Sequence, residues 1–301
     1  MAARPWIPLD GRDVILPNPE RLFFVCGPTA AGKSARAVEI ARELDGEIVN
    51  GDAFQLYHGL EILTAAPPTV DRREIPHHLY GEVSPPEAVD AMTYLRLVVP
   101  VIDELLARGK TPVITGGSGL YLKFLSHGPS PLPPGDPVLR AELAAQPLAA
   151  LVERLRALDP AEAARTDLHN RRYVSRALEV CLLSGAPCSS LRDDWAQASA
   201  TRAAKLRGIV IQRPRPELHH RIARRTRIML DDGAVEEVAA LGEIASGLEK
   251  AIGLREIRQM IAGEIDRPVC EELINAATRQ YAKRQDTWFR REGWLIPEST
   301  G

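Results

Sequence analysis

The sequence predicts an α/β protein in which a parallel sheet is flanked by helices and interrupted by a mainly helical insert. Short apolar runs alternate with helical patterns over residues 21–127, as in a parallel sheet with crossover helices. A proline-rich stretch then precedes a helical region, and the chain returns to a strand pattern at 206–211. The composition is globular, with 45% apolar and 26% charged residues among 301.

The first half of the chain supplies three strands and the helices that follow them. The expected elements, in order, are a loose arm (1–20), a buried strand (21–26), a helix (34–44), a second strand (47–51), a proline-containing loop (52–90), a helix (93–108), a third strand (111–115) and a turn that opens another helix (116–119).

The second half begins with a stiff linker, residues 128–137, which hold five prolines and two glycines. The pattern then predicts mostly helix over 138–183, irregular structure over 187–204, a strand at 206–211 and helix throughout the remainder. The expected organisation is therefore an N-terminal arm (1–20), an α/β core with a helical C-terminal part (21–127 and 206–301) and a helical insert (128–205).

A phosphate-binding motif follows the first strand. Residues 27–34, Gly-Pro-Thr-Ala-Ala-Gly-Lys-Ser, match GxxxxGK[ST] between a strand and a helix, where the motif is expected. The glycines allow backbone N–H groups to converge on phosphate oxygens, the helix N-terminus and Lys33 add positive charge, and the Ser34 hydroxyl can hold Mg²⁺. The motif predicts a P-loop NTPase-like core that binds a pyrophosphate group; the alternative is a glycine-rich turn without a ligand.

A carboxylate is expected beside this P-loop. P-loop ATPases and GTPases hold Mg²⁺ with an aspartate at the end of an apolar strand, but the third strand here ends in Gly116 and Gly117. Asp52 instead follows the second strand. Because the carboxyl ends of parallel strands line one crevice, we expect Asp52 and Ser118 near Lys33. The alternative for Asp52 is an exposed turn residue.

The net charge is −2, so any nucleic-acid site must be a local basic patch. Residues 213–227 carry six arginines, residues 278–291 carry five basic residues interleaved with aromatic ones, and residues 170–176 place Arg172 and Arg176 on one helix face. Cations mixed with flat aromatic side chains suit a structured RNA. The alternative is a set of solvated helix faces.

Several other kinds of site and class are disfavoured. Four scattered cysteines have neither zinc spacing nor the density of a disulfide scaffold, and loop packing explains the adjacent His77 and His78 better than metal binding does. The N-terminus lacks the apolar segment of a signal peptide, and no segment approaches 18 consecutive apolar residues. We expect a cytoplasmic protein with no membrane partner.

The residues resemble the bacterial tRNA dimethylallyltransferases, also called tRNA isopentenyl transferases, over positions 22–296. The resemblance rests on an ordered set of segments: GPTAAGKS at 27–34, Asp52 with Gln55, PHHL at 76–79, GGSGLY at 116–121, Asp159-Pro160, RALEV at 176–180, AIGLREI at 251–257 and TRQYAKRQDTWFR at 278–290.

This resemblance implies transfer of a dimethylallyl group from dimethylallyl diphosphate to the N6 amine of the adenosine just 3′ of the anticodon in tRNA, with release of diphosphate. It implies Asp52 as the general base, with Lys33 and Arg225 acting on the diphosphate. An adenine amine is a poor nucleophile that needs a positioned base, and the leaving diphosphate needs positive charge. The target base must also leave its stack.

The resemblance assigns further residues by position. The diphosphate or nucleotide site comprises Gly27, Pro28, Thr29, Ala30, Ala31, Gly32, Lys33 and Ser34, with Mg²⁺ as cofactor on Ser34. The contacts with tRNA, through its anticodon stem-loop, comprise Asp52, Ala53, Phe54, Gln55, Ser118, Arg171, Arg172, Arg176, Lys250, Gly253 and Arg255. The helical insert is expected to bind tRNA together with the core, and the enzyme is expected to be a monomer.

Five positions depart from the family pattern. Ala53 replaces a serine, Leu63 and Ala66 replace the glycine and the lysine of a GTAKP segment, and Leu254 replaces a tyrosine. Ser118 replaces the threonine of GGTGLY and keeps a hydroxyl. Ala66 removes a cation near the expected site. Because the implied catalytic residues are all present, we still expect an active enzyme.

Two other functions fit part of the sequence. The first is a small-molecule P-loop kinase that uses ATP, since the P-loop motif does not identify the molecule that carries the phosphates. The second is an RNA-binding protein with a vestigial P-loop, against which the intact Lys33, Ser34 and Asp52 argue.

Overall fold

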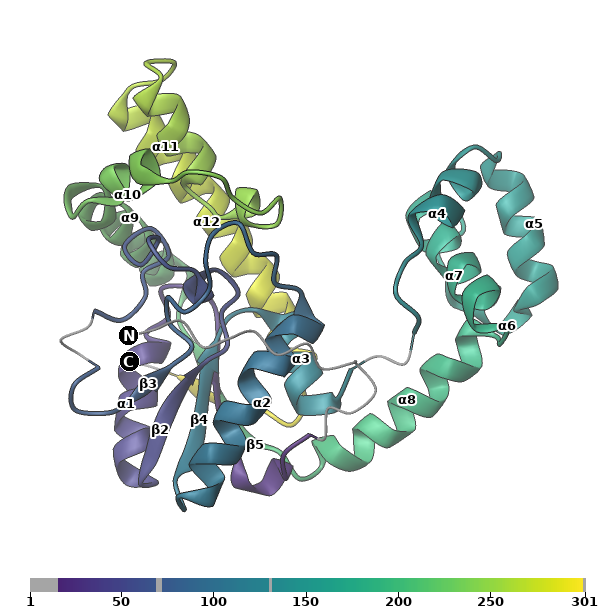
Figure 1. Cartoon of the computed structure of the whole chain (residues 1–301), viewed down its shortest axis with the longest axis horizontal. Helices are drawn as coiled ribbons and strands as arrows, with labels where there is room; N and C mark the ends of the chain where they lie inside the picture. The colour runs from purple at the N-terminus through teal and green to yellow at the C-terminus, as the bar shows by residue number, and fades with distance from the viewer. Residues whose placement is uncertain (1–15, 69–71, 130–131, 300–301) are drawn as a thin grey trace. The chain divides into compact units, whose positions relative to one another are not determined.

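The computed structural model describes residues 16–68, 72–129 and 132–299, and the chain divides into two compact units (Figure 1). One unit comprises Met1–Ser126 and Ala203–Gly301, and the other comprises His127–Arg202. The second unit corresponds to the helical insert that was predicted at 128–205. Of the predicted N-terminal arm, residues 1–15 lie outside the described residues, and a short 3₁₀ helix occupies Pro19–Arg21.

A parallel sheet forms the centre of the first unit, and its order within the described residues is β3-β2-β4-β1-β5-β6. Its strands are β1 (Phe23–Cys26), β2 (Gly46–Asn50), β3 (His77–His78), β4 (Thr111–Gly116), β5 (Arg207–Gln212) and β6 (Ile296–Ser299). Phe23 pairs with Val113 of β4 on one side and with Arg207 of β5 on the other. The predicted α/β class is confirmed, and all strands end at the same edge.

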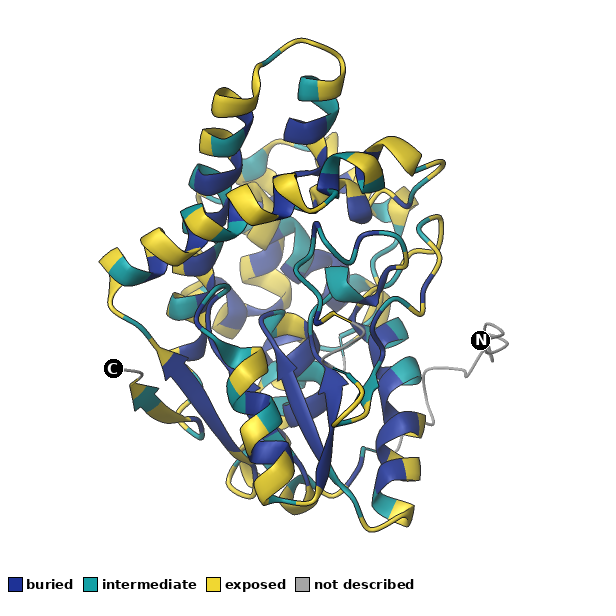
Figure 2. Ribbon diagram, turned by 90° about the vertical axis from the view of Figure 1, so that its left-hand side faces the viewer, coloured by how far each residue is buried: buried dark blue, intermediate teal, exposed yellow. Residues whose placement is uncertain are grey.

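Alternation along β1 builds a core on each face of the sheet. Phe24 and Cys26 belong to the larger apolar cluster, whereas Val25 belongs to a second cluster with residues of the helix after the P-loop. Figure 2 shows buried strands between helices whose outer faces are exposed. The helices of this unit are α1 (Lys33–Glu43), α2 (Ala91–Ala107), α3 (Gly119–His127), α9 (Arg215–Asp231), α10 (Ala234–Ala240), α11 (Leu254–Ile261) and α12 (Arg267–Phe289), with short 3₁₀ turns at Phe54–Leu56 and Leu248–Lys250.

The second unit is helical within the described residues. Its helices are α4 (Pro137–Ala144), α5 (Leu148–Leu158), α6 (Pro160–Arg165), α7 (Arg171–Ser184) and α8 (Cys188–Ala203), whose last residue lies in the first unit. Leucines of α4, α5 and α7, among them Leu143, Leu151 and Leu178, form a small core of their own. The predicted linker at 128–137 has residues 130–131 outside the described set, and its last residue begins α4.

The prediction of irregular structure over 187–204 is wrong, because α8 spans nearly all of this segment. The buried residues of α8 are Cys188, Ser189 and Ser199, and most others are exposed. A helix with so little core-facing surface has no apolar stripe of 3.6-residue period, which is the signal on which a sequence-based assignment depends.

Two further predictions need correction. The segment after 211 is not entirely helical, since β6 pairs with β5 in parallel and Ile209 lies opposite Ile296. Two features made β6 hard to predict from sequence: it contains Pro297, and most of its residues are exposed. Both are compatible with a strand at the edge of a sheet, where proline is tolerated, and β6 is an edge strand. Likewise, the predicted loop at 52–90 contains the two-residue edge strand β3, in which His77 lies opposite Ile48.

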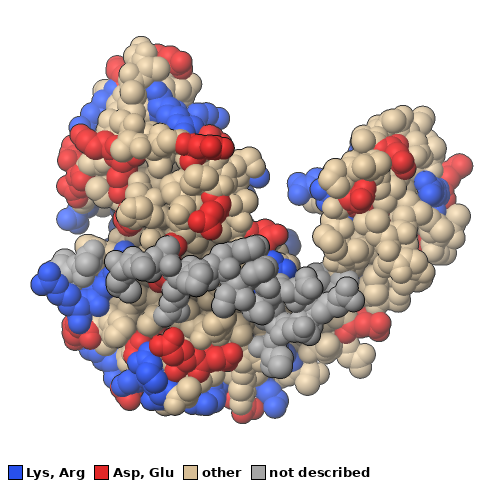
Figure 3. Space-filling view, in the orientation of Figure 1, with Lys and Arg blue, Asp and Glu red and all other residues tan. Residues whose placement is uncertain are grey.

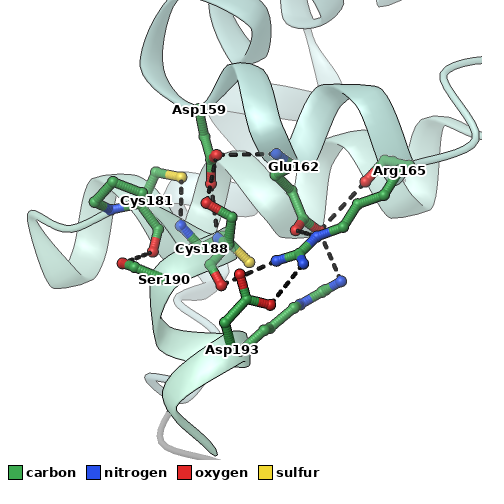
Figure 4. Close-up of polar contacts among 11 residues, drawn as sticks. Asp159, Glu162, Arg165, Cys181, Cys188, Ser190 and Asp193 are labelled. Atoms are coloured by element: carbon green, nitrogen blue, oxygen red, sulfur yellow. Dashed lines mark hydrogen bonds and ion pairs between the residues drawn. The ribbon is translucent and has the colours of Figure 1, made fainter. Parts of the chain in front are cut away.

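Buried carboxylates fasten α8 to α6 within the second unit (Figure 4). Asp159 accepts hydrogen bonds from the Glu162 N–H at 2.9 Å and from both the N–H and the hydroxyl of Ser189 at 2.7 Å. The fully buried Glu162 pairs with Arg165 at 2.7 Å and with Arg192 at 2.6 Å. Polar contacts therefore replace an apolar interface at this junction.

No helix within the described ranges combines the length and the apolarity that a bilayer-spanning segment needs.

We predict that Asp159→Ala lowers the free energy of unfolding of the second unit by about 2–4 kcal/mol. The change removes the cap of α6 and leaves the Ser189 donors unpaired in a buried place. Urea unfolding followed by hydrogen exchange in peptides of the second unit measures the effect. Asp167→Ala is the matched control, because Asp167 is exposed and accepts only from the His169 N–H, so it should cost less than about 1 kcal/mol. Equal losses in the two variants would contradict the structural role of Asp159.

Candidate active site

The P-loop occupies residues 27–34 between β1 and α1, and its glycines are required by the backbone. Gly27 has φ 144°, and a Cβ there would lie 2.9 Å from the carbonyl oxygen of Ile211. Gly32, with φ 100°, is the N-cap of α1. Lys33 begins the helix, and its Nζ donates to the carbonyl of Pro28 at 2.9 Å. The loop is thus shaped as the motif predicts for an anion cradle.

Three arginines donate hydrogen bonds to the P-loop, one from the turn after β5 and two from α9. The Nε of Arg213 donates to the Ala31 carbonyl and the Nε of Arg221 to the Ala30 carbonyl, each at 2.8 Å. Arg225 donates to the hydroxyl of Thr29, also at 2.8 Å. Arg213 is held in turn by an ion pair with Glu217. These guanidinium groups place positive charge against the loop where phosphate oxygens would bind.

Asp52 follows β2 and is held in place by backbone contacts. Its own N–H donates to the side chain of Asn50 at 2.8 Å, and its carboxylate accepts from the N–H of Phe54 at 3.2 Å. Asn50 is itself fully buried and donates to the Leu79 carbonyl at 2.8 Å. The carboxylate therefore has a defined direction at the carboxyl edge of the sheet.

The three charged groups of the site alter one another's pKa. Burial raises the pKa of Asp52, and the charge of Lys33 opposes that rise. Burial lowers the pKa of Lys33 to about 8, and the charge of Asp52 opposes that fall. Burial also lowers the pKa of Arg225, and the charge of Asp52 opposes that fall. Strongly perturbed groups that share a cavity are typical of functional sites.

A cavity of about 280 Å³ is lined by Asp52 and Arg225 and reaches the P-loop at Thr29. Its polar side carries Thr29, Asp52 and Arg225, and Lys250 and Arg284 also reach it. The remaining wall is largely apolar and is formed by Phe54, Leu63, Met229, Ala251, Ile252 and Ile274, with Thr64, Thr226, Thr278 and Tyr281. The site therefore joins an anion cradle and a carboxylate to a compartment that suits a hydrocarbon group.

Residues predicted around Asp52 have distinct positions. The Ala53 N–H donates to the Ser118 hydroxyl at 2.8 Å, which ties the turn after β2 to the turn after β4. Phe54 lines the cavity, whereas the Gln55 amide donates to the carbonyls of Thr64 and Ala65 and so holds the next loop.

The segment predicted at 250–255 reaches the cavity from the other side. Lys250 is exposed at the rim, and Gly253 is the N-cap of α11 with φ 99°. A Cβ at Gly253 would lie 2.8 Å from the Leu63 side chain, which lines the apolar wall. Arg255 is exposed and pairs with Glu256 at 2.7 Å.

The other departures from the family pattern occupy packed positions. Leu254, which replaces a tyrosine, is fully buried in the larger apolar cluster. Ala66 is partly buried against the second cluster and brings no charge to the loop.

The predicted arginines of the second unit divide into three kinds. Arg171 donates to the carbonyls of Leu143, Ala144 and Gln146 and closes the turn after α4. Arg176 pairs with the buried Glu179 at 2.5 Å and donates to the Pro133 carbonyl at 2.6 Å. Arg172 is exposed, and its guanidinium makes no hydrogen bond or ion pair within the described residues.

Sequence reasoning missed two members of the site on α12. Gln285 accepts from the Thr29 N–H at 2.8 Å, and Tyr281, one turn earlier, lines the cavity. Both lie within the basic segment 278–291, four residues apart on one helix face, but nothing in the sequence marks that face as the one that meets the P-loop.

Ser34 is the residue that the P-loop motif offers to a magnesium ion. Ser34 is exposed in the first turn of α1, and no group of three or more His, Cys, Asp or Glu side chains among the described residues could hold a metal ion. Mg²⁺ commonly keeps several waters and takes its remaining ligands from substrate phosphates and one or two protein groups. The donor set suits an ion that arrives with a diphosphate.

Comparisons with known proteins agree on one family. The sequence model of the family described as IPP transferase matches residues 55–292. The tRNA dimethylallyltransferase of Akkermansia muciniphila is 48% identical over 273 residues, which are 91% of each chain. The tRNA dimethylallyltransferase of Geobacter metallireducens is 40% identical over 286 residues, which are 92% of this chain and 91% of the relative.

Solved structures agree with the sequence relatives. The full-length tRNA isopentenylpyrophosphate transferase from Bacillus halodurans aligns with a TM-score of 0.66 and 30% identity, over 93% of this chain and 90% of that one. A eukaryotic dimethylallyltransferase acting on tRNA aligns with a TM-score of 0.76 over 92% of this chain and 73% of that one. Because the sequence identity of this pair is only 22%, the alignment shows that the two chains share a fold and nothing more.

We predict that inorganic diphosphate binds less tightly as the pH rises through about 8, because Lys33 loses its proton there in the free protein. Calorimetric titration between pH 6.5 and 9.5 measures the affinity. Lys33→Arg retains a cation at every pH in this range and should remove the break near pH 8. Lys33→Ala should bind weakly throughout. A pH dependence that is unchanged in Lys33→Arg would exclude Lys33 as its source.

Proposed function

Because the chain belongs to the IPP transferase family, it is a tRNA prenyltransferase, and we propose that it transfers a dimethylallyl group from dimethylallyl diphosphate to tRNA. The resemblance seen in the motifs is confirmed at the level of the family. In the proposal, the acceptor is the N6 amine of the adenosine 3′ of the anticodon. One observation carries it: a single cavity joins the P-loop and Asp52 to a largely apolar wall.

The diphosphate belongs in the P-loop in this proposal. Backbone N–H groups of the loop, Lys33 and Arg225 surround the place where its oxygens would lie. Negative charge grows on the diphosphate as its bond to the allylic carbon breaks. Fixed cations that need no reorganisation stabilise that charge more than they stabilise the ground state. The apolar wall receives the five-carbon group and keeps water from the allylic carbon.

Asp52 removes the proton from the attacking amine. The N6 nitrogen forms a bond to the allylic carbon, the carbon–oxygen bond breaks with its electron pair leaving on the diphosphate, and the amine proton passes to the carboxylate. Burial raises the pKa of Asp52, which makes the carboxylate a stronger base than an exposed aspartate. Lys33 and Arg225 keep it ionised by their charge.

Magnesium, when bound with the substrate, would neutralise part of the diphosphate charge, and Ser34 is the residue that would hold it.

The exposed side of α12 suits the tRNA. Lys283, Arg284, Trp288 and Arg291, with Gln280 and Thr287, line a groove of about 410 Å³. Trp288 is 40% exposed, and Gly119 is required beside it because a Cβ there would lie 2.6 Å from the indole nitrogen. A planar side chain among cations can stack an unpaired base beside bound phosphates.

The groove matters because the surface as a whole does not attract RNA. On the face drawn in Figure 3, acidic and basic side chains are interspersed outside the grey atoms. With a net charge of −2, affinity for tRNA has to come from local cationic groups. Two finer parts of the proposal, namely the anticodon stem-loop as the target and the monomeric state, rest on the resemblance of the motifs. Action in the cytoplasm is inferred from a sequence without signal-peptide or membrane-spanning patterns.

The ATP-dependent kinase is the second candidate, and two observations count against it. The strand beside β1 is β4, which ends at Gly116 with no carboxylate for Mg²⁺. The compartment beyond the P-loop is lined largely by apolar side chains, whereas a phosphoryl acceptor with hydroxyl groups would need polar partners.

Nucleoside mass spectrometry tests the proposal directly. Unmodified tRNA is incubated with the protein and either dimethylallyl diphosphate or ATP, digested and analysed. The proposal expects an adenosine heavier by one dimethylallyl group in the first reaction and none in the second. Consumption of ATP without prenylation would favour the kinase, and tRNA binding without either reaction would favour a vestigial P-loop.

We predict that Asp52→Asn lowers kcat by about 10²–10⁴-fold, the range for loss of a general base. The amide keeps the shape of the side chain, so tRNA affinity should change by less than about threefold. Single-turnover prenylation and filter binding measure the two quantities. In the wild type, kcat/KM should fall as the pH falls through the raised pKa of Asp52, because only the carboxylate accepts the proton. Near-wild-type turnover in Asp52→Asn would exclude the assignment.

We predict that Arg172→Ala flattens the dependence of log affinity on log salt by somewhat less than one unit, as expected for one lost phosphate contact. Binding of dimethylallyl diphosphate should be unchanged. Arg154, an exposed arginine on α5, provides the control Arg154→Ala, which removes the same charge. Equal flattening in both variants would indicate a general charge effect. Arg176→Ala is a poor probe, because its loss leaves the buried Glu179 with one fewer cation.

A further inference from the structure

Gln285 is a buried amide at the junction of the P-loop, α12 and the turn after β4. Its side chain is 3% exposed. Its oxygen accepts from the Thr29 N–H at 2.8 Å, and its nitrogen donates to the Gly117 carbonyl at 2.9 Å. Two loops that are far apart in sequence are thus joined through one residue of α12.

The chemistry of the two partners requires an amide. The Thr29 N–H can only donate and the Gly117 carbonyl can only accept, so the bridge needs one acceptor and one donor at a fixed separation. A carboxylate lacks the donor, and an apolar side chain lacks both. An amide at position 285 therefore satisfies both contacts at once.

Gly117 is shaped to admit the amide. A Cβ at position 117 would lie 2.1 Å from Nε2 of Gln285, closer than any real contact allows. The absence of a side chain is what lets the amide reach the carbonyl. The contact is consequently a built feature of both loops.

Each partner of Gln285 holds a group of the proposed chemistry. The hydroxyl of Thr29 accepts from Arg225 at 2.8 Å. Gly117 lies against the carboxylate of Asp52, since a Cβ at position 117 would lie 3.6 Å from Oδ2 of Asp52, and the Gly117 N–H lowers the pKa of that carboxyl against the rise caused by burial. Gln285 is therefore connected to Arg225 through Thr29 and to Asp52 through Gly117.

We propose that Gln285 is a positioning residue that sets the geometry of Asp52 relative to Arg225, by clamping Thr29 and Gly117 with one amide. This inference rests on the proposed function, because it assigns Asp52 and Arg225 their roles. Gln285 acts through these two loops and touches neither the amine nor the diphosphate in the proposed reaction. It differs from the exposed residues of α12, such as Trp288, which face the groove.

Loss of the clamp has a consequence that a stability defect does not share. In Gln285→Met, the Gly117 peptide is no longer held, its N–H bonds Asp52 less well, and the pKa of Asp52 rises. The acid limb of kcat/KM should then move to higher pH by about 0.5–1 pH unit, as for one weakened hydrogen bond. The other charged and titratable groups that act on Asp52 are Lys33, Arg225, Tyr80, Tyr94, Tyr121 and Tyr281. The variant also removes the contact between the Gln285 side chain and the Tyr281 hydroxyl, but burial raises the pKa of Tyr281, so this phenol does not titrate in the acid limb.

The experiment compares four proteins in prenylation of tRNA across pH. Gln285→Met should lower kcat by about 10–100-fold, as expected for a misplaced catalytic group, with tRNA affinity within about threefold of the wild type. Gly117→Ala should produce the same loss and the same shift, because its Cβ expels the amide. The double variant should be no worse than the more damaged single variant by more than about twofold.

Controls keep the interpretation specific. Gln197→Met makes the same change on the exposed face of α8 and should leave kcat and the pH profile unaltered. Thermal melting verifies folding. If Gln285→Met does not fold, Gln285→Glu takes its place, because its carboxylate still accepts from Thr29 yet cannot donate to Gly117 and must shift the acid limb. Multiplicative losses in the double variant, or an unshifted limb, would overturn the clamp.

A second measurement separates failure of the clamp from failure of the proposed function. The carboxyl carbon of Asp52, assigned by comparison with Asp52→Asn, is titrated by NMR in the wild type and in Gln285→Met. The clamp expects a higher pKa in the variant whether or not the protein prenylates tRNA. An inactive wild type would overturn the proposed function, whereas an active wild type with identical titrations in both proteins would overturn the clamp alone.

Discussion

Charge compensation among three buried groups is the interaction on which the site depends. Asp52, Lys33 and Arg225 are each pushed by burial toward their neutral forms, and each is kept ionised by an opposite charge beside it. One carboxylate between two cations leaves positive charge in excess. The arrangement that makes buried ions tolerable is therefore also the one that attracts a diphosphate, so stability and binding have the same electrostatic origin.

Strand order is what assembles this set. β2, β4, β1 and β5 are consecutive neighbours, and each strand delivers one component at its carboxyl end. Asp52 follows β2, Gly117 follows β4, the P-loop follows β1, and Arg213 follows β5. The loops are packed closely enough that a Cβ at Gly116 would lie 2.2 Å from the backbone of Gly51. Because all strands of a parallel sheet run in the same direction, the loops that follow them lie at the same edge.

Local signals explain which parts could be predicted. The P-loop has its own motif, and the place of Asp52 follows from the rule that parallel strands end together, so both were accessible from sequence. Gln285 was not, because its partner Thr29 lies 256 residues away and no periodicity reveals which face of α12 meets the loop. The predictions for the segments that form α8 and β6 were wrong for a related reason. Exposed elements carry little periodic hydrophobic pattern from which they could be recognised.

Composition alone does not separate an RNA surface from an anion site. Of the arginines at 213–227, Arg213, Arg221 and Arg225 donate hydrogen bonds to the P-loop. A cluster of cations in sequence is therefore evidence of phosphate chemistry, but not of which phosphate. On α12 the two uses are separated by helix face: Gln285 points into the site while Trp288 lines the outer groove. Because one rigid helix carries both faces, RNA that docks in the groove bears on the same element that holds Thr29 and Gly117. The proposed docking of RNA and the proposed positioning of Asp52 therefore use two faces of the same helix.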